Sequence, residues 1–244
     1  MDVLADLVAE QDRLESILSN LDDAAWETES GASGWTVTDV VLHLAQTEEA
    51  VVGTADRAGS SSSLAFSRAG TIDDAMDELV RSERAAPEVA FERWRVARRA
   101  AVERLRRADP KVPLQWAAAP LKPMTLATTR LAEHWAHGLD ITEPLDIPFP
   151  DTDRLRHVAW LGHGSLRYAF ALAGQEPHDV YCELVAPDGS AWTYGPPDAD
   201  STVTGPAGAF CRVGAQRLAP DDSGLETSGP YGDAALRVLR NYAG

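Results

Sequence analysis

The sequence predicts an α-helical four-helix bundle over residues 1–150 and a small α+β domain over residues 151–244. Apolar residues recur every three to four positions over long stretches of the first part, which is the pattern of amphipathic helices. After Pro150, a Pro-Asp-Gly turn separates two short runs of alternating character, which is typical of a β-hairpin. The change in pattern predicts two domains.

The bundle is expected to begin with a helix over residues 3–21, where the apolar positions form one broad stripe. A glycine-containing break follows. A second helix begins near Val37, where the side chain of Thr36 or of Thr38 can cap it. Small and polar residues at 59–70 then predict a loop.

Thr71 is followed three residues later by Asp74, which is close to a capping box and predicts the start of another helix. A proline suits the first turn of the long helix expected over residues 87–107. Residues 109–124 hold four prolines and are therefore predicted to form a long non-helical crossover. From Thr125 the helical period resumes and completes the four main helices of the bundle.

The second domain is expected to start with a helix over residues 152–174. The hairpin follows at 179–196, and two more helices are predicted within 205–218 and 233–244.

Composition excludes several classes of function. A formal net charge of −16 would repel a phosphate backbone, so we expect no nucleic acid partner. No apolar run approaches the roughly 20 residues needed to span a bilayer, and the acidic start does not look like a secretory signal, so we expect a cytoplasmic protein without a membrane role. Cys182 and Cys211 match no disulfide or thiolate zinc pattern and are expected to be buried thiols.

One short segment concentrates metal-ligand chemistry. Glu133 and His137 lie four residues apart, so a helix places both on one face. A catalytic metal usually takes three protein ligands, and His43, in the apolar helical segment VVLHLA, is the obvious third donor. His134 is an alternative to Glu133. A surface pair of Glu133 with His137, and a core histidine hydrogen-bonded elsewhere, would also fit the spacing.

The sequence assigns no definite role to other residues near these positions. Glu48 and Glu49 follow His43 by about one turn, and no general base is assigned to either. Trp35 is expected in the core, whereas Trp116 fits either the core or the wall of a cleft.

Two segments together resemble the DinB-like metal-binding superfamily, specifically the branch that includes mycothiol-dependent maleylpyruvate isomerases. The first is SGWTVTDVVLHLAQTEE, and the second, about ninety residues later, is EHWAHGLDI. The matching positions are Gly34, Trp35, Thr36, Val37, Asp39, Val40 and His43 in the first, and Glu133, His137, Gly138 and Asp140 in the second.

The resemblance implies a DinB-like four-helix bundle with one divalent ion bound by His43, Glu133 and His137. Zinc is the first expectation for this donor set, and nickel, iron and manganese are alternatives. The predicted C-terminal domain is also similar to the small α+β domain appended in this branch, which helps some members to bind thiol or substrate. By that likeness Arg212 or Arg217 is predicted to bind the cofactor; alternatively, both only solvate a helix.

The function that this resemblance implies is a metal-dependent isomerase or S-transferase that uses mycothiol on a small electrophilic metabolite. A thiol-independent isomerase, lyase or hydrolase with the same metal is the main alternative. A non-catalytic protein that binds a metal or small ligand is the third. The expected partner is a small-molecule substrate, and the chain is expected to be a monomer or a homodimer.

Overall fold

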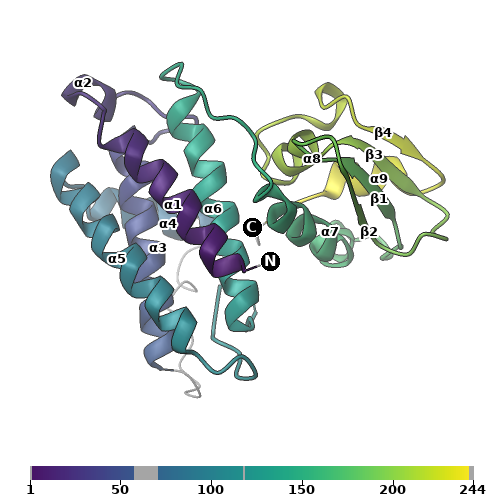
Figure 1. Cartoon of the computed structure of the whole chain (residues 1–244), viewed down its shortest axis with the longest axis horizontal. Coiled ribbons are helices and arrows are strands. Elements are labelled where there is room, and N and C mark those ends of the chain that lie inside the picture. Colours follow the sequence, from purple (N-terminus) through teal and green to yellow (C-terminus); the bar gives the residue numbers. More distant parts are fainter. Residues whose placement is uncertain (1, 58–70, 118, 242–244) are drawn as a thin grey trace. The chain divides into compact units, whose positions relative to one another are not determined.

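The computed structural model describes residues 2–57, 71–117 and 119–241. The chain separates into two compact units, one ending at Phe149 and one spanning Pro150–Tyr242 (Figure 1). Among the described residues, no helix is both long enough and apolar enough to cross a membrane. The polar loop predicted at 59–70 lies outside the described residues.

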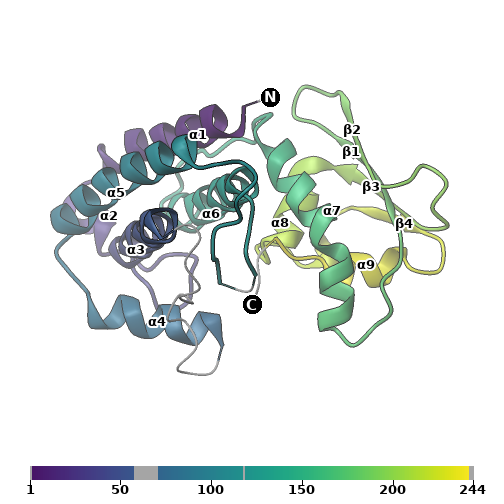
Figure 2. The same cartoon turned by 90° about the horizontal axis from the view of Figure 1, so that it is seen from below.

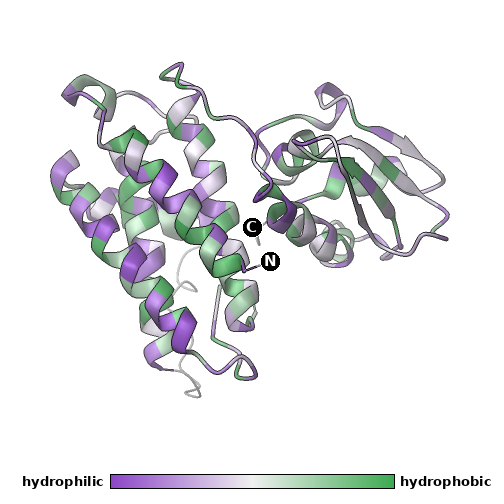
Figure 3. Ribbon diagram, in the orientation of Figure 1, coloured by the Kyte–Doolittle hydropathy of each residue, from purple (hydrophilic) through white to green (hydrophobic). Residues whose placement is uncertain are grey.

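Four long helices form the core of the first unit. α3 packs most extensively against α5, α1 packs against α6, and α3 also contacts α6 (Figure 2). Hydrophilic and hydrophobic residues alternate along α1 and α5, as expected for helices with one buried face (Figure 3). The four-helix bundle is therefore confirmed, with these bounds: α1 Val3–Leu18, α3 Val37–Asp56, α5 Pro87–Arg107 and α6 Pro123–Thr142.

Local hydrogen bonds fix where α3 begins. The hydroxyl of Thr36 accepts from the Asp39 amide at 3.2 Å, and the Asp39 carboxylate accepts from the Thr36 amide at 3.1 Å, which completes a capping box. Thr36 is thus the cap, whereas the hydroxyl of Thr38 donates to the Trp26 carbonyl. Trp26 ends the short helix α2 (Asp23–Trp26), which the sequence pattern did not predict.

The crossover and the helices beside it largely match the predictions. α4 (Ile72–Ser82) begins at the predicted capping box of Thr71 and Asp74. The described residues of the proline-rich crossover are not helical as far as Lys122, and Leu114 and Leu121 exchange backbone hydrogen bonds of 2.8 and 2.9 Å. α6 starts at Pro123, two residues before the predicted start, because a proline at the first helical position needs no hydrogen-bonding amide.

The second unit is a mixed sheet with helices beside it. The strand order is β2-β1-β3-β4; β1 pairs antiparallel with β2 and parallel with β3, and β3 pairs antiparallel with β4. The hairpin was predicted and the other two strands were not. Both are short, and the last two residues of β3, Gly205 and Pro206, lie in the segment 205–218 that was predicted to contain a helix. The elements are α7 Leu155–Leu172, β1 Tyr181–Val185, β2 Ala191–Tyr194, β3 Thr202–Pro206, α8 Ala207–Gly214, the 3-10 turn η1 Pro220–Asp222, β4 Glu226–Ser228 and α9 Gly232–Val238.

Candidate metal centre

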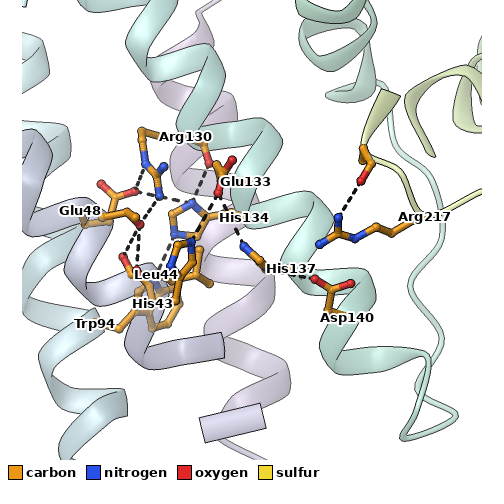
Figure 4. Close-up of polar contacts among 12 residues, drawn as sticks. His43, Leu44, Glu48, Trp94, Arg130, Glu133, His134, His137, Asp140 and Arg217 are labelled. Carbon is orange, nitrogen blue, oxygen red and sulfur yellow. Dashed lines mark hydrogen bonds and ion pairs between the residues drawn. The ribbon is translucent and has the colours of Figure 1, made fainter. Parts of the chain in front are cut away.

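Helices α3 and α6 bring three metal-donor side chains together. His43 comes from α3, and Glu133 and His137 come from consecutive turns of α6 (Figure 4). The Nε2 atoms of His43 and His137 lie 3.8 and 3.6 Å from Glu133 Oε2, and the three donors lie within 4.8 Å of one another. Within the described parts of the chain, this is the one group of three His, Cys, Asp or Glu donors with such a geometry.

The donor set fits a divalent ion. Ligands at roughly 2.0–2.1 Å from a tetrahedral zinc ion lie about 3.4 Å from one another. The two donor separations of 3.6 and 3.8 Å are only slightly longer, so small side-chain rotations would close them around an ion. Two imidazole nitrogens and one carboxylate oxygen leave a fourth position open, as in catalytic zinc sites.

Neighbouring residues orient His137. Its Nδ1–H donates to Asp140 Oδ2 at 2.9 Å, which leaves the lone pair of Nε2 directed at the donor group. The next residue, Gly138, packs closely against Phe149: a Cβ atom on Gly138 would lie 2.5 Å from the Cζ atom of the Phe149 ring. The Gly-x-Asp that follows His137 therefore has a structural reason on both counts.

His43 is held by packing instead. Its ring centroid lies 5.0 Å from that of Trp35 and 5.0 Å from that of His137. Its buried Nδ1 has no hydrogen-bond partner among the described residues. Trp35 is itself buried, as predicted, and its indole N–H donates to Asp77 at 3.0 Å.

Burial and charge prepare these groups for a cation. Desolvation lowers the pKa of His43 from 6.5 to about 4, and His137 adds to the effect, so this imidazole is neutral at pH 7. Desolvation opposes ionisation of Glu133, but contacts with His137 and His43 outweigh it and hold its pKa well below the ordinary value. The pKa of His137 is raised, because Asp140 and Glu133 outweigh desolvation.

The structure separates His134 from the donor group. Its Nδ1–H donates to the Arg130 carbonyl at 2.8 Å, and its Nε2 accepts from the Trp94 indole N–H at 3.1 Å (Figure 4). Both ring nitrogens are therefore engaged inside the bundle. Of the two alternatives considered from the sequence, the structure brings Glu133 to the donor group and not His134.

Sequence reasoning missed a buried ion pair beside the donors. Arg130 of α6 donates from Nε to Glu48 Oε1 at 2.8 Å, and both side chains are almost wholly buried. Desolvation raises the pKa of Glu48, although Arg130 opposes the shift. Glu49 instead pairs with Arg93 and is exposed. An arginine on the apolar face of α6, three residues before Glu133, was the available signal.

The two arginines predicted to bind a cofactor lie in the second unit. Arg212 Nη1 donates to Asp151 Oδ2 at 2.9 Å, and Arg217 Nη1 donates to the Ala215 carbonyl at 2.7 Å. These contacts orient both side chains within their own unit. Their role in binding thiol or substrate stays a prediction.

Comparison with known proteins agrees with the geometry. Residues 7–142 match the family described as the mycothiol maleylpyruvate isomerase N-terminal domain. The chain belongs to this family. The matched range includes all three donors, and the resemblance read from the sequence motifs is confirmed.

Relatives and solved structures extend the likeness to the whole chain. Uncharacterized proteins from two strains of Mycobacterium tuberculosis are 34% identical to this family member over 247 residues, covering 99% of this chain and 95% of each relative. The crystal structure of the mycothiol-dependent maleylpyruvate isomerase matches with a TM-score of 0.62 at 16% identity, and that of a mutant of the enzyme with 0.64 at 14%. Each comparison covers 93% of this chain and 91% of the other, so the fold of both units is shared.

Proposed function

We propose that the chain is a metal-dependent enzyme of thiol chemistry: an isomerase or S-transferase that uses mycothiol on a small electrophilic metabolite. The observation that carries the proposal is the convergence of His43, Glu133 and His137 from two helices. The solved proteins with this fold are described as a mycothiol-dependent maleylpyruvate isomerase, which supports a thiol cofactor.

The ligand set favours an anionic fourth ligand. Neutral imidazoles at His43 and His137 and an ionised Glu133 carry a single negative charge, so a bound divalent ion would leave the site positive. Such an ion lowers the pKa of a coordinated thiol and supplies a thiolate nucleophile at neutral pH. Asp140 accepts the Nδ1 proton of His137 and keeps Nε2 available as a donor.

The cysteines of the chain do not provide this thiolate. Cys182 and Cys211 are both free and buried. Burial raises the pKa of Cys182 to about 12 and raises that of Cys211 further, so both remain thiols at neutral pH. Neither belongs to the donor group. In the proposed reaction, the nucleophilic sulfur would therefore come from a bound cofactor.

The test combines metal content with thiol binding. Protein purified without chelator is expected to hold one divalent ion per chain, with zinc the first expectation. Mycothiol should raise the thermal unfolding temperature of the metal-loaded protein and not that of the metal-free protein. Turnover of maleylpyruvate or a related electrophile should need both metal and mycothiol. Cys182→Ala is the control and should keep full turnover.

The alternatives give different results. Metal-dependent turnover that ignores mycothiol would replace the proposal with a thiol-independent isomerase, lyase or hydrolase. Bound metal without mycothiol stabilisation or turnover would indicate a non-catalytic binding protein. If the protein binds no ion at equimolar zinc, the proposal and both alternatives are contradicted, because all three begin with a bound metal.

A further inference from the structure

A buried arginine connects the two helices that carry the metal donors. Arg130 of α6 donates from Nε to Glu48 Oε1 at 2.8 Å and from Nη2 to Thr47 Oγ1 at 2.7 Å. Both partners are in α3, and Figure 4 shows Glu48 beside Arg130. One rigid guanidinium thus contacts two consecutive residues across the helix interface, and its fork geometry fixes direction as well as distance.

The connection lies one turn from the donors on each helix. Arg130 precedes Glu133 by three residues, and Thr47 follows His43 by four. The hydroxyl of Thr47 also lies 3.0 Å from the His43 carbonyl, to which it donates. A continuous chain of hydrogen bonds therefore runs from the α6 side chain of Arg130 to the backbone of the α3 donor.

Stability alone does not explain this arrangement. Arg130 and Glu48 are 2% and 0% exposed, and a buried ion pair of this kind is often no more stable than apolar residues of equal volume. Glu48 Oε2 is buried without a hydrogen-bond partner among the described residues, so part of its desolvation is uncompensated. The best-attested use of such pairs is to fix the register of packed elements.

The crossover covers this pair. The Cζ atom of Arg130 lies 5.8 Å from the centre of the Trp116 ring, and the neighbouring Gln115 carbonyl accepts from the Thr54 hydroxyl of α3 at 2.7 Å. The half-buried Trp116 thus limits the access of water to the guanidinium, which strengthens its hydrogen bonds. The sequence alone left Trp116 undecided between core and cleft, and its contact here is with Arg130.

We infer that Arg130 is a positioning residue for the metal centre. It holds α3 and α6 in the register that sets the separation of His43 from the pair of Glu133 and His137. The inference rests on the proposed metal-binding function. It adds a residue outside the donor group that acts through Thr47 and Glu48.

The experiment compares metal affinity with fold stability. Zinc affinity is measured by competition with a chromophoric chelator, and cobalt absorption reports the geometry of the bound ion. In Arg130→Met, zinc affinity should fall roughly 10–100-fold, the usual effect of removing a residue that orients ligands, and the cobalt spectrum should change. Arg130→Lys keeps the positive charge but not the forked guanidinium, so its zinc affinity should lie between that of Arg130→Met and that of the wild type.

The chain offers a matched control. Arg98 of α5 is also a buried interhelical arginine, and it donates to Asp12 at 2.9 Å and to Glu15, both in α1. Neither α1 nor α5 carries a donor of the site. Arg98→Met should lower the unfolding temperature of the metal-free protein about as much as Arg130→Met does, with unchanged zinc affinity and an unchanged cobalt spectrum.

The outcomes separate this inference from the proposed function. If the wild type binds no zinc, the metal centre itself is wrong. If the wild type binds zinc and Arg130→Met binds it equally well, Arg130 is structural only and the inference is overturned. If Arg130→Met does not fold, Thr47→Val decides. This near-isosteric variant removes only the hydroxyl, and unchanged zinc affinity and an unchanged cobalt spectrum would overturn the inference.

Discussion

His134 and His137 lie three residues apart on α6, and their surroundings differ in kind. The His137 ring lies between two carboxylates, with Asp140 at 2.9 Å from Nδ1 and Glu133 at 3.6 Å from Nε2. The His134 ring is fully buried between a carbonyl and an indole N–H. The Nε2 atom of His137 can receive a cation, whereas both ring nitrogens of His134 are already hydrogen-bonded, one within α6 and one to α5.

The protonation of the two rings differs accordingly. Desolvation, helped by the charge of Arg130, lowers the pKa of His134 to about 3. Desolvation acts on His137 as well, but its two carboxylates outweigh it and raise the pKa. His137 therefore differs from His134 in having two neighbouring carboxylates: Asp140 accepts its Nδ1 proton, and Glu133 lies beside its Nε2. Spacing along the helix does not distinguish the two rings.

The largest effect is expected when a donor is removed. His137→Ala and Glu133→Ala each leave two of the three protein ligands, so zinc affinity should fall by more than the roughly 100-fold that marks the loss of an orienting residue. Titration with zinc in the presence of a competing chelator measures the change. If either variant binds zinc as tightly as the wild type, the substituted residue is not a metal ligand, and the contrast between His137 as a ligand and His134 as a structural residue is wrong.

The reverse experiment removes the structural histidine. His134→Ala opens a cavity beside Trp94 and leaves the Trp94 indole N–H without its acceptor, so the free energy of unfolding should fall by about 2–4 kcal/mol. Urea unfolding of the metal-free protein measures this loss. Zinc stoichiometry should stay at one per chain, and a variant that folds yet loses its zinc would make His134 part of the metal site.

The sequence predicted the candidate metal donors better than it predicted the buried contacts of His134. A four-residue spacing fixes a shared helix face, so an ExxxH pair and a distant imidazole made His43, Glu133 and His137 candidates, with His134 as an alternative to Glu133. The choice between Glu133 and His134 depended on the resemblance. Only the packing of α5 against α6 shows that the Trp94 indole engages His134, whose other ring nitrogen bonds the Arg130 carbonyl within α6.

The fold shows the same division. Helices with caps of their own, such as the one that Thr36 opens, were predictable because their signals are local. Strands β3 and β4 were not. Their pairing is non-local: Thr202 in β3 is paired with Tyr181 on one side and with Ser228 on the other, and neither segment shows a clear alternation. Long-range pairing of short strands leaves little trace in a single sequence.

A milder change sharpens the account of His137. Asp140→Asn keeps an oxygen that can accept from Nδ1–H but removes the negative charge, so the imidazole becomes a weaker donor. Zinc affinity should fall about 10-fold, with little change in the cobalt spectrum because the ring keeps its orientation. The comparison is with Asp77→Asn, whose carboxylate accepts from Trp35 and contacts no donor imidazole through a hydrogen bond. Equal zinc affinities for Asp140→Asn and Asp77→Asn would show that the charge of Asp140 does not contribute to zinc binding.

The smallest effect concerns the protonation of His134. Unfolded chains bind a proton on this residue near pH 6.5, whereas the folded chain does not until about pH 3. Protonation therefore lowers the free energy of the unfolded state relative to the folded state as the pH falls below 6.5. Stability is present above pH 6.5 and is lost on acidification. At pH 5.5 the loss from this one group is about 1 kcal/mol relative to pH 7.5.

The same titration in His134→Gln isolates the effect. The low pKa of His43, about 4, and the carboxylates also make the metal-free protein sensitive to acid, but these groups are common to the variant and the wild type. Subtracting the two urea-unfolding series, each measured at pH 7.5 and 5.5, therefore leaves the contribution of His134. Parallel losses in the two proteins would mean that the folded chain accepts the proton at His134, and the contrast with His137 would then rest on geometry alone.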